Sequence, residues 1–338
     1  MTNRSDTVTG NAPLNAAIVG LGRWGQRLVD SVTTPPSSRI RFVRGVARTP
    51  SKVPSSIVER GIAVSSDFAS VLADRSVQAV VLATPHTQHA EQIVAAARAG
   101  KHVFVEKPFT LTAASARTAV EACKAAGVIL AVGHNRRFLP AMAEIARRVK
   151  SGALGEILHL EGNFSGNFGL GYSPGMWRAT DAESPAGGMT AMGIHILDAF
   201  IQLAGRITWV RCESHHKAVP VDADDTTSVL LGFRSGATGY LGTMIATGRM
   251  VRVQVFGTKG WLHLLDHHLL DVCDIDGKVE RIEFPKIDAE RAELESFADA
   301  VQGGAEFPVP LDEAVHGIAV LEAAIRSAGR DAEKVTLE

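Results

Sequence analysis

Short apolar runs that alternate with helical patterns most constrain how the first part of this chain can fold. The apolar runs occupy residues 15–20, 39–48, 78–84, 102–105 and 128–135. Strands that are apolar throughout are buried on both faces, which is typical of a parallel sheet covered by helices. The alternation therefore predicts a doubly wound α/β domain over residues 15–135.

The pattern changes after about residue 140. Helical patterns now cover residues 141–150, 189–204, 289–301 and 311–328, with several strand candidates between them. Strand candidates joined by short turns are typical of a largely antiparallel sheet. We expect residues 136–338 to form an α+β domain with a large, mostly antiparallel open sheet. Residues 1–14 are polar and lack the apolar segment of a secretory signal, so we expect a flexible leader there.

Charge and cysteine content exclude several classes of protein. The net charge is -1, from 35 basic and 36 acidic residues, and no basic stripe predicts a nucleic-acid partner. No apolar run approaches a membrane span, so no membrane partner is expected. Cys123, Cys212 and Cys273 show neither a disulfide framework nor metal spacing, which fits a cytoplasmic protein. The histidine pairs 215–216 and 267–268 lack further ligands at suitable spacing, so we predict no metal site.

A glycine motif of the form G-x-G-x-x-G follows the first apolar run. It comprises Gly20, Gly22 and Gly25, with Arg23 and Trp24 between the last two. The motif follows a predicted strand and opens a predicted helix, the context it needs for a dinucleotide. Glycine permits the tight turn and the approach of a pyrophosphate, whose charge the N–H groups at the helix N-terminus favour. We predict that these residues bind NAD or NADP; the alternative is a tight turn without a ligand.

The end of the second predicted strand bears on which dinucleotide binds. An acidic residue that binds the adenosine ribose of NAD is expected about 20 residues after the motif. Arg48 and Thr49 stand at that strand end, and no acid accompanies them. A guanidinium and a hydroxyl suit the 2′-phosphate of NADP. We therefore expect NADP as the preferred cofactor and NAD as the second choice; the alternative is an ordinary exposed loop.

Polar clusters end three of the predicted strands. Their members are Thr84, Pro85, His86, His89, Glu106, Lys107 and Asn135. Ligands of an open α/β sheet bind outside the carboxyl ends of its strands, so we predict that these residues contact the cofactor. Lys107 can also act as a general acid or base if burial and neighbouring charges lower its pKa. Pro108 fixes the turn after it, with a cis peptide as one option. The alternative is a solvated ion pair at a strand exit.

Six segments spread along nearly the whole chain match a known family. They are AAIVGLGRWG, VVLATPHTQHAEQIVAAARAGKHVFVEKPFTLT, AVGHNRRF, MWR, GGMTAMGIHILDAF and ESFADAVQGG. In these segments the chain resembles the glucose-fructose oxidoreductase / inositol dehydrogenase / MocA family. The resemblance implies a Rossmann domain, then an α+β domain whose open sheet often forms the interface of a homodimer or homotetramer. It also implies NAD(P)-dependent oxidation or reduction of a sugar, polyol, inositol or related cyclic alcohol. Lys107 would be the catalytic lysine, and His195 the histidine on the substrate side.

One position departs from that family. Its members commonly carry D-x-G-x-H in the helix of the substrate domain, whereas this chain has Ala191 at the aspartate position and keeps His195. A helical spacing of four puts both residues on one face, so a carboxylate that would contact the substrate or tune the histidine is missing. We expect Asp198 to orient His195 or bind substrate, and Arg178 to bind a substrate oxygen or carboxylate. A purely structural role is the alternative for each.

The missing carboxylate has two interpretations. In the first, which we favour because Lys107 and His195 both remain, the protein is an oxidoreductase that acts on CH–OH groups, and proton transfer rests on these two residues. In the second, it is a catalytically silent regulator that binds a dinucleotide or a sugar. A third hypothesis keeps the enzyme class and changes the substrate to a non-sugar ring diol.

Overall fold

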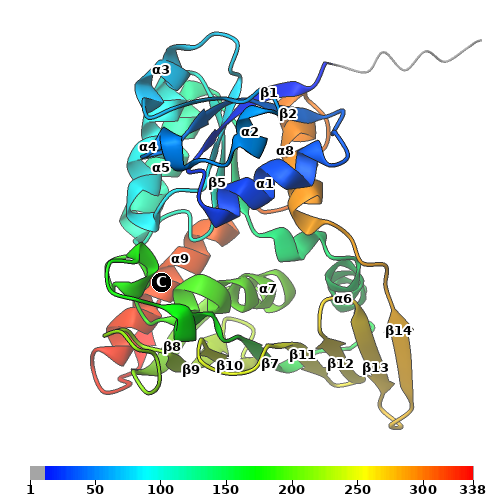
Figure 1. Cartoon of the computed structure of the whole chain (residues 1–338). Helices are drawn as coiled ribbons and strands as arrows, with labels where there is room; N and C mark the ends of the chain where they lie inside the picture. The colour runs from blue at the N-terminus through cyan, green and yellow to red at the C-terminus, as the bar shows by residue number, and fades with distance from the viewer. Residues whose placement is uncertain (1–11, 338) are drawn as a thin grey trace, which may run out of the picture.

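The chain folds into two packed domains, one above the other in Figure 1. The computed structural model describes residues 12–337, so most of the leader predicted for residues 1–14 lies outside the described residues. Within this part of the chain, no helix combines the length and the apolar character needed to cross a membrane.

A parallel sheet forms the centre of the first domain. Between residues 12 and 337 its six strands are β1 (Leu14–Val19), β2 (Ile40–Val46), β3 (Ala63–Ser65), β4 (Ala79–Leu82), β5 (His102–Glu106) and β6 (Leu130–Gly133). The order β3-β2-β1-β4-β5-β6 confirms the predicted doubly wound topology. The order reverses between β1 and β4, and ligands of such sheets bind outside the carboxyl ends of the strands at this switch point.

Helices pack on both faces of this sheet. They are α1 (Arg23–Thr33), α2 (Ser55–Val58), α3 (Phe68–Ala73), α4 (His86–Arg98) and α5 (Ala113–Ala126), with the short turn η1 (Pro50–Lys52). The inner face of α1 presents Leu28, Val29 and Val32 to a core that includes Ile18 of β1, and all four side chains are almost fully buried. Burying a side chain of this size contributes about 1.5–3 kcal/mol.

A larger sheet forms the second domain. In the described chain its nine strands are β7 (Ile157–Ser165), β8 (Ile207–His215), β9 (Thr226–Phe233), β10 (Thr238–Met244), β11 (Met250–Gly257), β12 (Gly260–Leu265), β13 (Leu269–Asp274), β14 (Val279–Glu283) and β15 (Val335–Thr336). The order is β14-β13-β12-β11-β7-β10-β9-β8-β15. The central pair β7 and β10 is parallel and the other pairs are antiparallel. This confirms the mostly antiparallel sheet that we expected, and the parallel pair was not predicted.

Helices cover the face of this second sheet that looks toward the first domain, and the opposite face is open (Figure 1). The long ones are α6 (Pro140–Lys150), α7 (Ile194–Ala204) and α9 (Leu311–Ala328). Three short turns precede α7: η3 (Phe168–Gly171), η4 (Trp177–Ala179) and η5 (Met189–Gly193). Buried Leu197 and Phe200 of α7 share one core with Leu160 of β7.

A helix from near the end of the chain completes the first domain. α8 (Ala289–Val301) inserts Leu294 and Phe297 into the core around β1, and the Phe297 ring lies 5.8 Å from the Phe104 ring of β5. It also packs against η2 (Asn135–Phe138), the turn that leads into the second domain. The core of the predicted 15–135 domain therefore includes a segment that lies more than 150 residues later.

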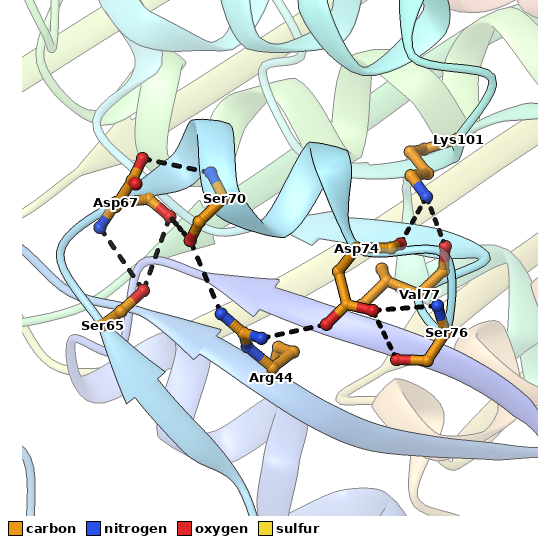
Figure 2. A network of polar contacts seen from close by, with 8 residues as sticks. All are labelled: Arg44, Ser65, Asp67, Ser70, Asp74, Ser76, Val77 and Lys101. Carbon is orange, nitrogen blue, oxygen red and sulfur yellow. Dashed lines mark hydrogen bonds and ion pairs between the residues drawn. The ribbon is translucent and has the colours of Figure 1, made fainter.

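A polar cluster joins α3 to β2 and to the turn before β5 (Figure 2). Asp74, at the end of α3, accepts a hydrogen bond from Arg44 of β2 at 2.9 Å. The Lys101 ammonium donates to the carbonyl oxygens of Asp74 at 2.8 Å and Val77 at 2.7 Å. Because Lys101 is only 7% exposed, these two carbonyls are the natural partners of an almost buried charge.

Replacing Lys101 with Met removes both hydrogen bonds and keeps most of the apolar stem. The two carbonyl oxygens lose their charged donor, so we expect the free energy of unfolding to fall by about 1–3 kcal/mol. Chemical denaturation measures this change. Lys124→Met, at an exposed position of α5, is the matched control and should shift stability by less than about 0.5 kcal/mol. Equal losses in the two variants would contradict the role given to Lys101.

Candidate active site

The turn between β1 and α1 is shaped by its glycines. Gly20 has a φ of 98°, in the left-handed region, and a Cβ there would lie 2.5 Å from the carbonyl oxygen of Ala83. A Cβ on Gly25 would lie 1.9 Å from the Gly20 oxygen, so glycine is needed for α1 to start this close to β1. Gly22 caps α1 without a side-chain hydrogen bond and borders open space. The first N–H groups of α1 are therefore free of a side-chain cap and can receive an anion.

The end of β2 lies directly beside this glycine turn. The Gly20 N–H donates to the Val46 carbonyl at 2.9 Å. Arg48 and Thr49 follow, both are exposed, and the segment 46–52 contains no acidic residue. The structure thus brings together the glycine turn and a basic strand end without a carboxylate.

The segment after β4 supports a neighbouring turn. His89 is fully buried, and its ring nitrogens Nδ1 and Nε2 each lie 3.0 Å from a carbonyl oxygen, of Pro108 and Thr84 respectively. The Thr84 hydroxyl donates to Gln92 at 2.6 Å, and Pro85 caps α4. The predicted cofactor contact of His89 is therefore corrected. With no exposed surface, His89 holds the turn after β5 against the end of β4.

His86 anchors a loop of the second domain. Its Nδ1 lies 2.6 Å from the carbonyl oxygen of Glu183, and its ring centroid lies 5.1 Å from that of Trp177. Burial lowers the pKa of His86 to about 3, so the ring is neutral and Nδ1 donates its hydrogen to the carbonyl. The Trp177 ring in turn carries the Arg178 guanidinium at 4.3 Å, a cation–π contact. This arrangement brings Arg178 close enough to help lower the pKa of Lys107.

Lys107 of the first domain contacts the second domain directly. Its Nζ donates to the carbonyl oxygen of Ala191 in η5 at 2.6 Å. Burial lowers the pKa of Lys107 to about 8, although the neighbouring Glu106 carboxylate opposes the shift. The Lys107–Pro108 peptide is cis. The side chain itself is half-buried, so its nitrogen is shielded from water but not sealed off.

Carboxylates from two distant segments meet behind Lys107. Burial raises the pKa of Glu106 to about 6, and the charge of Lys107 opposes this. Trp24 of the glycine motif is half-buried beside Glu106, whereas Arg23 is exposed. Burial, followed by the charge of Glu106, raises the pKa of Glu293 in α8 well above its usual range, which favours its neutral form.

Glu293 and its helix neighbour Glu290 were not predicted as site residues. Glu290 accepts hydrogen bonds from Asn135 and Arg27, each at 2.8 Å, while Glu293 is fully buried. Their spacing offered a signal, because Glu290, Glu293 and Phe297 recur at i, i+3 and i+7 on the buried face of one helix. Acidic residues on the apolar face of a helix indicate either a buried ion pair or a functional site.

The segment before His195 is not the regular α-helix that the sequence predicted over 189–204. It is a π-helical turn, in which the Ile194 N–H reaches back five residues to the Met189 carbonyl. The Ala191 methyl packs with the apolar cluster around Met192. The expectation that Ala191 and His195 share one α-helical face is therefore corrected, because the Ala191 carbonyl, not its side chain, contacts Lys107.

His195 lies just after this π turn, in a buried position. Its ring centroid is 5.8 Å from that of Phe164 and 6.2 Å from that of His134. Burial, followed by the positive charges of Lys107 and Arg136, lowers the pKa of His195 well below its usual value. The imidazole is therefore neutral and offers one donor and one acceptor.

Asp198 does not orient His195 or face a ligand. Its carboxylate accepts three hydrogen bonds from Arg137, between 2.7 and 3.1 Å, and it is 5% exposed. Arg137 also donates to Glu313 of α9 at 2.6 Å. The substrate contact predicted for Asp198 is therefore corrected: its oxygens are committed to a buried ion pair that holds η2 to α7.

A small cavity borders His195, and a larger pocket adjoins that cavity. The small cavity, of about 20 Å³, is lined by His195, Phe164, Arg136 and His267 among other residues. The larger pocket, of about 350 Å³, shares Arg136 and His267 with it and extends to Lys286. Arg136 was not predicted as a site residue, and His267 was considered only as a metal ligand and rejected. The segment GHNRRF follows β6, but the sequence did not show which of its two arginines lines the pockets.

Several buried polar atoms at this edge have no hydrogen-bond partner in the part of the chain that the structure describes. They include Asn135 Oδ1 and His195 Nδ1. Buried polar groups in proteins are almost always paired. These atoms therefore fit a bound dinucleotide and a polyhydroxy substrate, both rich in donors and acceptors. Over residues 12–337, no three His, Cys, Asp or Glu side chains are arranged to hold a metal ion.

Comparisons with known proteins agree with this geometry. The family model described as "Oxidoreductase family, NAD-binding Rossmann fold" matches residues 14–134. A second model, described as "GFO/IDH/MocA C-terminal domain", matches residues 142–263. Each match falls on one of the two sheets.

Named relatives extend over most of the chain. The scyllo-inositol 2-dehydrogenase (NAD(+)) of Bacillus subtilis (strain 168) is 29% identical over 309 residues, which cover 86% of this chain and 87% of the relative. The trans-1,2-dihydrobenzene-1,2-diol dehydrogenase of Mus musculus is 27% identical over 273 residues, which cover 80% of each chain. The structure of aldose-aldose oxidoreductase from Caulobacter crescentus complexed with glycerol has a TM-score of 0.86 at 26% identity and covers 96% of this chain and 100% of that one. The two domain matches and these relatives show that the chain belongs to the GFO/IDH/MocA family of oxidoreductases, whose first domain is an NAD-binding Rossmann fold.

Proposed function

We propose that this protein transfers a hydride between NADP or NAD and a carbon that bears a hydroxyl or carbonyl group in a sugar, polyol, inositol or related cyclic alcohol. The observation that carries the proposal is the amine of Lys107, half-buried at the strand edge where the glycine turn and His195 converge. When bound, the nicotinamide supplies the hydride acceptor or donor. The names of the inositol, dihydrodiol and aldose relatives support a cyclic or sugar-like alcohol.

Lys107 acts as the general base when the alcohol is oxidised. With its pKa lowered to about 8, part of the lysine is a neutral amine near neutral pH. The carbonyl of Ala191 accepts a hydrogen bond from either the amine or the ammonium, so it holds Nζ in both protonation states. His195, kept neutral by burial, binds the same substrate oxygen and shares the proton. Arg178 extends the site toward other substrate oxygens.

The silent-regulator hypothesis gains no support from the residue at position 191. A missing carboxylate would argue for lost chemistry if it left Lys107 without an anchor. The Ala191 carbonyl supplies that anchor at 2.6 Å. A ring diol remains an open choice of substrate, since it offers the same CH–OH group.

NADP is our preferred cofactor. Arg48 and Thr49 are exposed beside the glycine turn, and no acid on the segment 46–52 repels a 2′-phosphate. NAD is the second choice, and the name of the Bacillus relative supports it.

The proposal includes assembly into a homodimer or homotetramer through the open face of the second sheet (Figure 1). Leu230 of β9 and Met250 of β11 are 49% and 52% exposed, and they alternate along their strands with residues buried beneath the helices. Exposed apolar residues that recur on one uncovered sheet face favour a contact with a second copy.

Lys107→Ala tests the proton-transfer role. We expect turnover to fall by about 100-fold or more, the usual size of a general acid–base contribution. Turnover is measured with NADP(H) and NAD(H), in both directions, over sugars, inositols and ring diols. Dinucleotide binding should persist in the variant, and Lys124→Ala serves as the surface control. Near-normal turnover of Lys107→Ala would remove the assignment.

The pH dependence follows from the sign of the Lys107 shift. Oxidation needs the amine, so kcat/KM should rise about tenfold per pH unit below about 8 and level off above it. Reduction needs the ammonium, so its kcat/KM should decline above the same pH. Steady-state rates between about pH 6 and 10 measure both limbs. If kcat/KM of Lys107→Ala keeps the same pH dependence, another group is the one that titrates.

Arg48→Ala tests the cofactor preference. Loss of a charge-assisted hydrogen bond to the 2′-phosphate should raise KM for NADP by about tenfold and leave KM for NAD nearly unchanged. Arg41→Ala is the matched control, since Arg41 is exposed on the same strand but near its other end. An equal change for both cofactors would contradict the role of Arg48.

A further inference from the structure

The 350 Å³ pocket that adjoins the small cavity at His195 has no role in the proton transfer described above. It lies between η2, the turn before β13 and the segment that leads into α8. It shares Arg136, Leu139 and His267 with the 20 Å³ cavity that reaches His195. The larger volume falls in the range of small-molecule sites, and the smaller one holds about one water or one substituent. The pocket therefore adjoins the cavity at His195 through residues that line both.

Uncommitted charge in the pocket is positive. Its two acids are both engaged: Asp266 accepts from Arg249 at 2.9 Å, and Glu290 accepts from Arg27 and Asn135. Within residues 12–337, neither Arg136 nor Lys286 has a carboxylate within ion-pair distance, and both line the pocket.

Arg136 is held in place without a hydrogen-bond acceptor. Its guanidinium carbon lies 5.4 Å from the centroid of the Phe164 ring. Among the described residues, its Nε is buried without a partner, and the same is true of His195 Nδ1 and His267 Nε2. All three nitrogens belong to side chains that line the small cavity. Such unpaired buried nitrogens are costly unless a ligand supplies the missing hydrogen-bond partners.

We infer that the substrate carries an anionic group, a carboxylate or a phosphate, which Arg136 and Lys286 bind while the reacting carbon lies between Lys107 and His195. This inference rests on the proposed function and names the substrate class. A guanidinium presents paired donors to two oxygens of one anion, and an ammonium adds a point charge. A neutral polyol is a poorer match, because its hydroxyl donors also need acceptors and the two acids of the pocket are already paired.

Calorimetric titration of the full chain in the presence of NADP tests the inference. The probes are glucose, gluconate and glucose 6-phosphate at equal ionic strength. We expect at least one anion to bind about tenfold or more tightly than glucose, and its affinity to fall as salt is added. The two anions distinguish a carboxylate from a phosphate. Glucose binding as tightly as both anions, or no anion binding at all, would overturn the inference.

Lys286→Gln locates the anion. Lys286 is exposed, so the variant should fold normally, and the affinity for the preferred anion should fall about tenfold toward that of glucose. Lys278→Gln removes the same charge from the exposed turn between β13 and β14 and should leave the anion affinity unchanged. Equal effects of the two substitutions, or no effect of Lys286→Gln, would overturn the assignment of the pocket.

Turnover of the same three compounds, with an inositol added, separates this inference from the proposed function. If an anion binds in a way that depends on Lys286 but no compound exchanges a hydride, the anion site is supported and the proposed function is contradicted. If glucose or the inositol is turned over and no anion binds more tightly than glucose, the proposed function is supported and the anion site is contradicted.

Discussion

The burial of the Lys107 ammonium is the constraint on which the rest of the site depends. A charge removed from water needs compensating hydrogen bonds, and one of these comes from Ala191 in the other domain. The lysine is therefore in its working position only when the two domains pack together. His86 and Glu183 reinforce the same junction from the neighbouring strand end. The surroundings of Lys107 therefore depend on the packing of the two domains.

A π-helical turn supplies the carbonyl that Lys107 contacts between the two domains. In a regular helix the carbonyls of successive residues are occupied by N–H groups four positions later. The wider turn of η5 presents the Ala191 carbonyl to Lys107. A carbonyl carries no net charge, so it anchors the lysine without stabilising the ammonium as a carboxylate would. The pKa of Lys107 can then stay low even though Glu106 lies next to it. An alanine at this position is therefore compatible with a working base.

Much of the fold and part of the site could be predicted from sequence, because those features follow local or topological rules. The left-handed φ of Gly20 and the close approach at Gly25 depend on a few neighbouring residues. The convergence of polar strand ends follows from any parallel sheet. This is why the glycine turn and Lys107 were found at the same edge.

Two of the errors come from hydrogen bonds that local patterns do not reveal, and a third comes from an irregular helical turn. His89 looked available until Pro108 and Thr84 were seen to occupy both ring nitrogens. Asp198 looked free to bind a ligand, but Arg137, 61 residues earlier, takes its oxygens. Periodicity alone could not reveal the π turn, because almost every residue from 189 to 201 is buried and the segment shows no clear apolar period.

The return of α8 to the first domain has a consequence for how the chain is made. Leu294 and Phe297 fill the core around β1, so that core stays open until almost the whole polypeptide has been synthesised. Domains generally fold as units in the order in which they emerge from the ribosome. Here the first domain has to wait for the strands of the second. Until α8 arrives, its apolar sheet face is exposed to chaperones and to other nascent chains.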